Sequence, residues 1–476
     1  MLRRFINTVI NFQSYIFLFV FAFSACRVGK EFKRPEVKLP ENFSQQVAGD
    51  STSIADLEWK KFFNDPGLQL LIEQGINYNY DLMLAVKRLE ISQQQVKQAK
   101  LGQLPEVDFF IAGQYNHPSK NSINGKSANS ILGKSHIENY VTAVNLSWEV
   151  DIWGKIRGQK EATLASYLES YEGRKAVQTQ LVSNIAQGYF NLLMLDKQLE
   201  IAKKNLVLRD SFLVTTRLLR DAGVVNTLAV QQAESQRQTT AILVPELEQN
   251  IALQEYALQV LTGQLPTKLS RQTVLNKLAL TDDLSAGLPA ALLSRRPDVR
   301  AKEMSLVAAN AQVGIAKANM FPALNITAGA GLESFQSSNW FSIPNSLFGL
   351  AAGSIAQPIF RRRALKTEFE IAKLHREEAV IEFRQSVLQA TSEVESSLVQ
   401  IEKLREQEQI ASDQVDTLQR AIVNAQMLFK SDMANYLEVL NAQGSALLAE
   451  LNLASVQRQQ LSAKVELYRS LGGGWK

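Results

Sequence analysis

The longest regular pattern in this chain is a seven-residue repeat of apolar positions close to its C-terminus. The positions follow at alternating spacings of three and four residues: Leu437, Leu440, Gly444, Leu447, Leu451, Ala454, Arg458, Leu461, Val465 and Tyr468. Such a repeat is typical of a helix in a coiled coil, although Gly444 and Arg458 interrupt its apolar character. A second apolar stripe predicts that the helix packs on two sides, as helices in a closed cylinder do: Val439, Ala442, Ala446, Leu453 and Val456.

Proline-free stretches predict further helices of unusual length. From about residue 157 to 221 the chain has no proline and no cluster of loop residues. A helix of about 65 residues at 1.5 Å each has a length on the order of 100 Å. A second long helix is predicted over about 224–262, with a kink or interruption at Pro245. Corresponding helices are predicted near the C-terminus, over about 361–430 and 434–471.

Shorter segments alternate between apolar and polar residues and predict two pairs of strands, over about 105–116 and 139–151, and over about 322–333 and 346–358. Alternation over about ten residues is typical of a transmembrane strand with one face on lipid and one on water. A half-buried strand of a soluble sheet gives the same pattern. The long polar segments between the paired strands, 116–138 and 333–345, favour the outer-membrane barrel, whose extracellular loops are long.

Four strands do not close a barrel, because the smallest membrane barrels have about eight. An open sheet edge in lipid costs several kcal/mol for each unpaired backbone group. If the strands lie in a membrane, several copies of the chain therefore share one barrel. Three copies of these four predicted strands would supply twelve.

An internal duplication organises the chain. The pairs of landmarks are Asp81 with Asp298 and Pro105 with Pro322, both 217 residues apart, and Gly223 with Asp432, 209 apart. The predicted regions are an N-terminal periplasmic or equatorial segment (26–65), a first repeat (66–265), an equatorial linker (266–296) and a second repeat (297–472). Each repeat contains a helix, two strands and two long helices. Asp81 and Asp298 would place negative charge at the positive end of the first helix of each repeat.

The N-terminus predicts a secretory signal peptide over residues 1–25, with two arginines, an apolar stretch, and Ser24-Ala25 before Cys26. Cys26 is the only cysteine of the chain, and its position after two small residues resembles the lipoprotein signal. We expect covalent lipid on Cys26, although Phe23 stands where that signal usually has Leu. A free cysteine behind a short membrane anchor is the alternative. No later segment has about eighteen consecutive apolar residues, so no spanning helix is predicted after the signal.

Composition and motifs provide little support for an enzyme or a nucleic-acid-binding protein. The 476 residues are 46% hydrophobic and 21% charged with a net charge of +4, and this small dispersed charge argues against nucleic acid. His117, His136 and His375 lack metal-ligand spacing, and there is no second cysteine to join them. No glycine-rich phosphate loop precedes a helix. We therefore expect no cofactor, no metal and no catalytic residues, and an energy source in another protein.

Several motifs together resemble one family. They are Cys26-Arg27-Val28-Gly29 with Phe32, Pro35 and Leu39-Pro40; Trp148-Glu149-Val150-Asp151-Ile152-Trp153-Gly154; Leu261-Thr262-Gly263-Gln264-Leu265-Pro266; Gly287-Leu288-Pro289; Arg295-Arg296-Pro297-Asp298-Val299-Arg300-Ala301-Lys302-Glu303; and Gln357-Pro358-Ile359-Phe360. In this order they resemble the TolC-like outer-membrane factors, in the lipoprotein branch (NodT/OprM-like) that serves resistance-nodulation-division (RND) pumps. The resemblance covers nearly the whole mature chain.

The resemblance implies a membrane α+β fold: a homotrimer with a twelve-strand barrel in the lipid of the outer membrane, continuous with a twelve-helix periplasmic tunnel. It implies passive efflux through the tunnel, with an inner-membrane RND pump and a periplasmic adaptor protein as partners. The tips that meet the adaptor would be the two helix-to-helix turns: Asp221, Gly223, Val224 and Val225 in the first, and Asp432, Met433 and Ala434 in the second.

The resemblance also implies a gate at the second tip. Glu438 matches an acidic position of the family's constriction, and Asn441 stands where some members have a second aspartate. Three copies of Glu438 would form a ring that favours cations; the alternative is an ordinary exposed helix residue. Phe429 and Ala434 replace the Tyr and Arg of the best-known gate of the family, so that tie is not transferred to this chain.

Other functions stay open at this point. The same tunnel could serve an ABC-type exporter of peptides or proteins, in which case only the partner differs. A structural coiled-coil lipoprotein without a pore is a third interpretation, and the sequence does not name the exported substrate.

Overall fold

The computed structural model describes residues 28–43, 53–271, 273–278, 280 and 285–476. Cys26 and the predicted signal peptide lie outside these residues. The described chain divides into two units. One contains the residues up to Pro35 together with Ile91–Leu168 and Met304–Ile381, and the other contains Glu36–Glu90, Glu169–Glu303 and Glu382–Lys476.

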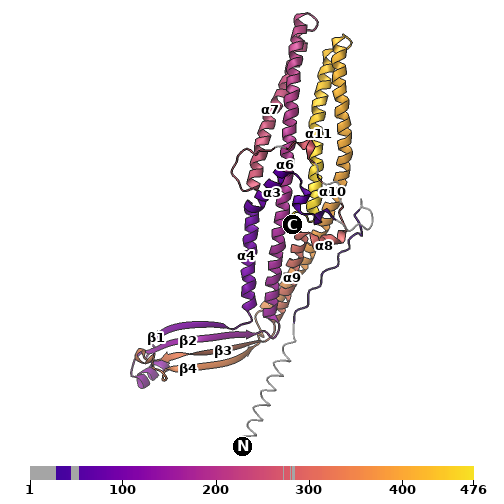
Figure 1. Cartoon of the computed structure of the whole chain (residues 1–476). Helices are drawn as coiled ribbons and strands as arrows, with labels where there is room; N and C mark the ends of the chain where they lie inside the picture. Colours follow the sequence, from indigo (N-terminus) through magenta and orange to yellow (C-terminus); the bar gives the residue numbers. More distant parts are fainter. Residues whose placement is uncertain (1–27, 44–52, 272, 279, 281–284) are drawn as a thin grey trace. The chain divides into compact units, whose positions relative to one another are not determined.

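The strands of both repeats form one antiparallel sheet in the first unit (Figure 1). The strands are β1 (Glu106–Asn116), β2 (Ile137–Val150), β3 (Ala323–Ser334) and β4 (Leu347–Ala356), in that spatial order. Each begins and ends within two residues of its predicted range. Because β2 of the first repeat pairs with β3 of the second, β1 and β4 are left as the two edges of this sheet.

The register separates an apolar face of the sheet from a polar one. Val107 of β1 lies opposite Leu146 of β2, and Leu146 lies opposite Ala328 of β3. The neighbouring positions on the other face include Asp108 opposite Asn145. Every residue of β1 is exposed in the single chain, whereas a soluble half-buried strand would cover its apolar face. This exposure favours the membrane interpretation of the alternation.

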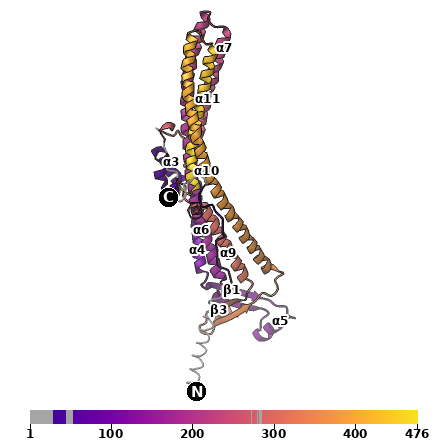
Figure 2. The ribbon, with the colours of Figure 1, turned by 90° about the vertical axis from the view of Figure 1, so that its right-hand side faces the viewer.

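The helices of the two repeats match in length. Helices α4 (Tyr80–Leu101) and α9 (Pro297–Ala318) have 22 residues, α6 (Lys155–Asp221) and α10 (Ala364–Lys430) have 67, and α7 (Thr227–Leu261) and α11 (Tyr436–Ser470) have 35. Figures 1 and 2 show α7 beside α6, and α11 beside α10, as two helical hairpins. The long helices lie within three residues of their predicted ranges. Equal lengths in all three pairs support the duplication.

Short helices occupy the connections. They are η1 (Ile54–Asp56), α2 (Trp59–Phe62), α3 (Pro66–Tyr78), α5 (Ile123–Ser127), η2 (Ala128–Leu132), η3 (Leu275–Lys277), η4 (Pro289–Ala291), α8 (Leu292–Arg295) and η5 (Ser337–Asn339). Two of these, α5 and η2, lie in the segment between β1 and β2 that the sequence predicted only as a polar loop. No helix among the described residues is long and apolar enough to span a bilayer.

The expected interruption at Pro245 does not occur. Helix α7 continues through this proline, whose side chain is exposed. A single proline removes one helical hydrogen bond and crowds the preceding turn. Helical residues on both sides of it, and the burial of Thr240 and Leu247, keep the helix continuous.

The linker between the repeats is held by ion pairs. Arg271 donates hydrogen bonds to Asp196 of α6, with 2.7 Å between Nη2 and Oδ1, and to Glu255 of α7. Both carboxylates raise the pKa of Arg271 above its ordinary value, against the opposing effect of burial. The linker therefore fastens the base of the first hairpin.

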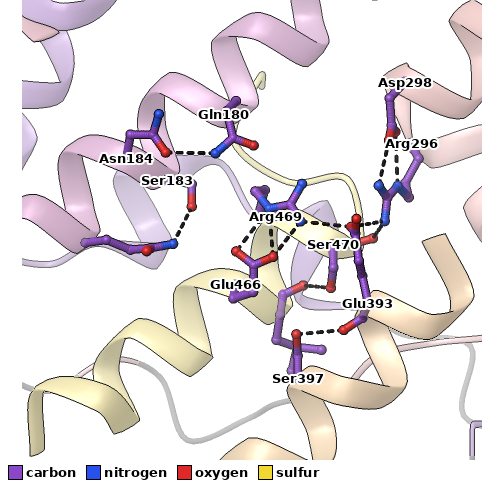
Figure 3. Close-up of polar contacts among 12 residues, drawn as sticks. Gln180, Ser183, Asn184, Arg296, Asp298, Glu393, Ser397, Glu466, Arg469 and Ser470 are labelled. Carbon is purple, nitrogen blue, oxygen red and sulfur yellow. Dashed lines mark hydrogen bonds and ion pairs between the residues drawn. The ribbon is translucent and has the colours of Figure 1, made fainter. Parts of the chain in front are cut away.

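An ion-pair network holds the base of the second hairpin (Figure 3). Arg296, whose side chain is 4% exposed, donates to Asp298 at 2.6 Å, to Glu393 of α10 at 2.8 Å and to the carbonyl oxygen of Ser470 at 3.1 Å. Arg469 of α11 donates to the same Glu393 at 2.8 Å. Burial by itself would lower the pKa of Arg296, but its two carboxylate partners raise it. The network therefore joins the start of α9 to α10 and α11.

We predict that Arg296→Ala lowers the thermal stability of the purified protein. Removing the arginine leaves Glu393 and Asp298 without their buried partner, and we expect a loss of about 2–3 kcal/mol because both carboxylates are partly exposed. Lys302→Ala is the matched control, since its ion pair with Glu382 also joins α9 to α10 but is exposed on both sides. Circular dichroism melting in detergent measures both; equal melting temperatures for the two variants would contradict the prediction.

Candidate functional site at the helix tips

The first tip turns the chain from α6 into α7 with a glycine in the left-handed conformation. Gly223 has φ of 77°, and its amide donates to the carbonyl oxygen of Arg220 at 2.9 Å. The amide of Val224 donates to the carbonyl oxygen of Leu219 at 2.9 Å. These two bonds satisfy the last carbonyl groups of α6 in a Schellman motif. Asn226 then caps α7 by accepting a hydrogen bond from the amide of Ala229.

The second tip repeats this geometry with aspartate in place of glycine. Asp432 has φ of 57°, its amide donates to Phe429, and the amide of Met433 donates to Leu428 at 2.9 Å. Asn435 caps α11 and accepts from the amides of the first turn, including that of Glu438. Aspartate is one of the few residues that adopt the left-handed conformation at modest cost. Both tips are therefore tight turns built by the same hydrogen bonds.

The tips present apolar side chains to solvent. Met433 is 77% exposed and Val224 is 58% exposed. Asp221 and Gly223 are also exposed, whereas Val225 and Ala434 are half-buried. Contiguous exposed apolar surface is typical of protein docking sites, whereas single exposed apolar residues are common on any surface.

The candidate gate residues lie on one face of α11. Glu438 and Asn441 are three residues apart, so their side chains are neighbours on the helix, and both are exposed in the single chain. No hydrogen bond or ion pair of either side chain is present among the described residues. Their place in a ring of three copies stays a prediction.

Two contacts tie the hairpins together near their tips. The hydroxyl group of Tyr436 on α11 donates to Oε1 of Gln232 on α7 at 2.6 Å. The rings of Phe212 on α6 and Phe429 on α10 lie 6.3 Å apart. They border a groove of about 520 Å³ that also includes Leu219. Within one chain, this aromatic pair and the hydrogen bond between Tyr436 and Gln232 thus join the two hairpins. They lie near Phe429 and Ala434, which replace the Tyr and Arg of the best-known gate of the family.

A buried arginine follows Leu208, which lines this groove. Arg209 of α6 is 4% exposed, and Nη1 donates to Oε1 of Gln236 at 3.2 Å, while Nε has no partner among the described residues. Burial without a carboxylate lowers the pKa of Arg209. A methyl group at Gly444 would lie 3.8 Å from Nη2 of Arg209, and Oε1 of the neighbouring Gln443 also lacks a partner among the described residues. The interruption of the seven-residue repeat at Gly444 therefore faces the guanidinium group of Arg209 at ordinary van der Waals distance.

Sequence reasoning located the tips but missed these contacts. Tyr436 and Gln232 belong to different repeats, and nothing in their spacing indicates that they meet. Gly444 did show as an irregularity, although its partner Arg209 had no signal of its own. His136 pairs with Glu138 and stacks on Tyr115. Within the described part of the chain, no group of histidine, cysteine or acidic residues has the arrangement of a metal site.

Comparison with known proteins identifies the family. The family model described as "Outer membrane efflux protein" matches residues 71–264 and 288–473. These two segments cover both repeats and most of the chain, so the protein belongs to the outer membrane efflux protein family.

Individual relatives match along almost their full length. The cation efflux system protein CusC of Escherichia coli O6:H1 is 27% identical over 97% of this chain and 98% of the relative. The probable outer membrane lipoprotein SilC of Salmonella typhimurium is 27% identical over 96% and 97%. The toluene efflux pump outer membrane protein TtgF of Pseudomonas putida is 30% identical over 95% of both.

Solved structures show the same fold. CusC matches with a TM-score of 0.85 and 27% identity, over 94% of this chain and all of that one. The Neisseria gonorrhoeae MtrE outer membrane channel in its open state matches with a TM-score of 0.85 and 26% identity, over 95% and 99%. The predicted fold class, a duplicated membrane α+β channel with barrel strands and long tunnel helices, is confirmed. The protein is an efflux channel of the bacterial outer membrane.

We predict opposite effects for two substitutions of glycine in α6 and its tip. Neither Gly223 nor Gly173 has an atom within 4 Å of an added methyl group. Gly223→Ala should destabilise the tip by about 1 kcal/mol because of its positive φ, whereas Gly173→Ala should stabilise the helix by about 0.5–1 kcal/mol. Amide hydrogen exchange of residues near each site measures both. Slower exchange around the first tip in Gly223→Ala would contradict the assigned turn.

Proposed function

We propose that three copies of this chain form the passive exit duct of a tripartite efflux pump. Cargo would enter at the helix tips from a periplasmic adaptor and an inner-membrane pump, and leave through the barrel. The observation that carries this proposal is the four-stranded sheet with two open edges and an exposed apolar face, attached in sequence to paired helices of 67 and 35 residues.

Oligomerisation follows from the cost of open edges. In lipid, each unpaired backbone group of β1 and β4 would cost several kcal/mol. Pairing the β4 edge of one copy with the β1 edge of the next removes both edges. Three copies of the four strands give twelve strands, an even number as in bacterial outer-membrane barrels, and three copies of the four long helices likewise give a ring of twelve.

The gate would lie at the second tip. In a trimer, Glu438 is present three times at one level of the tunnel, and a ring of carboxylates attracts cations. The exposure of Glu438 and Asn441 on one face of α11 and the absence of a side-chain partner for Glu438 in the described chain support this role. The contact between Tyr436 and Gln232 would hold the hairpins together when the tunnel is shut.

The partners follow from the tips and from the relatives. The exposed apolar tip residues Val224 and Met433 would meet the adaptor. We propose a pump of the RND class as the energy source. An ABC-type exporter would use the same duct, and co-purification with a crosslinked adaptor distinguishes the two. A structural lipoprotein without a pore is disfavoured by membership of an efflux family.

We propose that Cys26 carries covalent lipid, because it follows Ser24-Ala25 and because the relative SilC is described as a probable outer membrane lipoprotein. The cargo is not shared among the relatives, because one is named for cation efflux and another for toluene efflux. Selection among substrates therefore belongs mainly to the pump. No cofactor or catalytic residue is part of this proposal.

We predict that the purified protein conducts ions across a planar bilayer and that Glu438→Gln weakens its cation preference. The substitution removes one negative charge from each copy at the constriction, so the reversal potential in a salt gradient should shift toward zero. Asp221→Asn removes the same charge from the other tip and should leave the reversal potential unchanged. An unchanged potential in Glu438→Gln would exclude this residue from the ring, and a complete lack of channels would contradict the proposed function.

We predict that Val224→Ser together with Met433→Ser weakens adaptor binding by at least about tenfold. The loss comes from apolar surface that each tip would bury against the adaptor, at about 25 cal/mol for each Å². Affinity of the detergent-solubilised channel for its adaptor, measured by biolayer interferometry, tests this. Single-channel conductance serves as the control, since neither side chain belongs to the candidate constriction, and unaltered affinity would contradict adaptor docking at these turns.

A further inference from the structure

The duplication extends to the register of individual strand residues. Val107 of β1 lies opposite Leu146 of β2. Adding 217 to the first number and 209 to the second gives Leu324 and Ile355, which lie opposite each other in β3 and β4. The same two offsets relate α4 to α9, which begin at residues 80 and 297, and α6 to α10, which begin at 155 and 364. One pair of offsets thus relates both halves of the sheet.

Side-chain contacts at the ends of the strands obey the same offsets. Nε1 of Trp148 donates to the carbonyl oxygen of Gln103 at 2.9 Å. The equivalent Gln357 donates through Nε2 to the carbonyl oxygen of Met320, the equivalent of Gln103, at 3.0 Å. The turns before α6 and α10 also match, because Gly154 has φ of 77° and its equivalent Arg363 has φ of 67°.

The two repeats meet at one seam, where β2 pairs with β3. At the end of this seam Nε1 of Trp153 donates to the carbonyl oxygen of Pro322 at 2.7 Å, and its ring packs on Phe321 at 4.9 Å between centroids. Trp153 thereby fastens the turn that follows β2 to the residues that precede β3.

We propose that neighbouring copies join by repeating this seam, with β4 of one copy in the place of β2 and β1 of the next in the place of β3. The proposal rests on the trimer proposed above and adds its register. Leu146 lies opposite Ala328 in the internal seam, so the offsets place Ile355 opposite the partner's Ile111. By the same rule Val144 opposite Ala330 becomes Gly353 opposite the partner's Gly113.

The polarity of the faces agrees with this register. Ile355 lies opposite Leu324, which lies opposite Val150, and all three belong to the apolar face. Side chains alternate between the two faces along β1. Ile111 therefore shares the face of Phe109, two residues away, and lies on the opposite face from Phe110. A shift by one residue would place Ile355 beside the polar face of β1.

The proposal assigns a role to an arginine that has no partner within the described part of its own chain. The offset of 209 places Arg362 where Trp153 stands in the internal seam, and the offset of 217 places the partner's Pro105 where Pro322 stands. Arg362 is exposed, has φ of 50°, and makes no side-chain hydrogen bond or ion pair among the described residues. Such a backbone conformation is costly for a residue with a side chain.

The neighbour of Pro105 supplies the complementary charge. Glu106 is the first residue of β1, is exposed, and has no ion pair among the described residues. At the seam, the guanidinium group of Arg362 would donate to the carbonyl oxygen of the partner's Pro105 and pair with the carboxylate of the partner's Glu106. The ion pair between Arg362 and the partner's Glu106 would thus join neighbouring copies at the position where the indole of Trp153 joins the two repeats within one chain.

Disulfide crosslinking in the full-length protein tests the register. Residues directly opposite each other have Cβ atoms about 4.5–5.5 Å apart, while diagonal neighbours are about 7–8 Å apart. Ile111→Cys combined with Ile355→Cys, and Gly113→Cys combined with Gly353→Cys, should form reducible trimers on oxidation. Ile111→Cys combined with Gly353→Cys is the control shifted by two residues and should crosslink several-fold less, and the unsubstituted protein controls for Cys26.

Charge reversal tests the ion pair. Arg362→Glu and Glu106→Arg should each lower the fraction of SDS-resistant trimer at a fixed temperature by about fivefold, and the double variant should restore it. Arg362→Trp should keep the trimer, because the indole makes the equivalent contact in the internal seam.

The outcomes separate the two proposals. Stable trimers that crosslink only through the shifted pair would overturn the register while leaving the proposed duct intact. Normal crosslinking with no rescue in the double variant would overturn the ion pair between Arg362 and Glu106. A protein that is monomeric by mass and crosslinks through no pair would overturn the proposed function itself.

Discussion

The backbone hydrogen bonds at the edges of the β1–β4 sheet are the constraint on which the rest of the structure depends. A chain with four strands has too few to close on itself, and lipid offers no donor or acceptor to the edge groups. In the proposed trimer the chain shares its sheet with copies of itself, and the helices that continue from the strands are brought into the same ring. A tunnel then requires only helices long enough to reach its far end, which 67 residues provide.

The duplication reduces the number of different contacts that such an assembly needs. Two repeats with matching helices and matching strand registers can use one type of seam both within and between chains. In the proposed trimer, a residue that both repeats share occurs six times around the ring. A residue that differs between the repeats occurs only three times. The tips show this plainly, because Gly223 and Asp432 form the same turn with different charge.

The sequence predicted the elements of this fold well because each had a strong local signal. Long proline-free stretches marked the helices, and alternation marked the strands to within two residues. Long-range partners had no such signal. The interruption at Gly444 was visible, but only the fold shows that Arg209 lies next to it. Pro245 predicted an interruption of its helix, but α7 continues through this residue. At the candidate site, family resemblance located the tips and Glu438, while the contact between Tyr436 and Gln232 joins two repeats and required the fold.

The proline within α7 makes the two hairpins mechanically unequal. Pro245 has no amide hydrogen, so the carbonyl group of Ala241 lacks its helical donor, whereas the equivalent position in α11 is the buried Ala454. A helix bends most easily where its hydrogen-bond ladder is broken. The first hairpin should therefore bend more easily than the second. In the proposed ring of three copies, three hairpins that bend more easily would alternate with three stiffer ones.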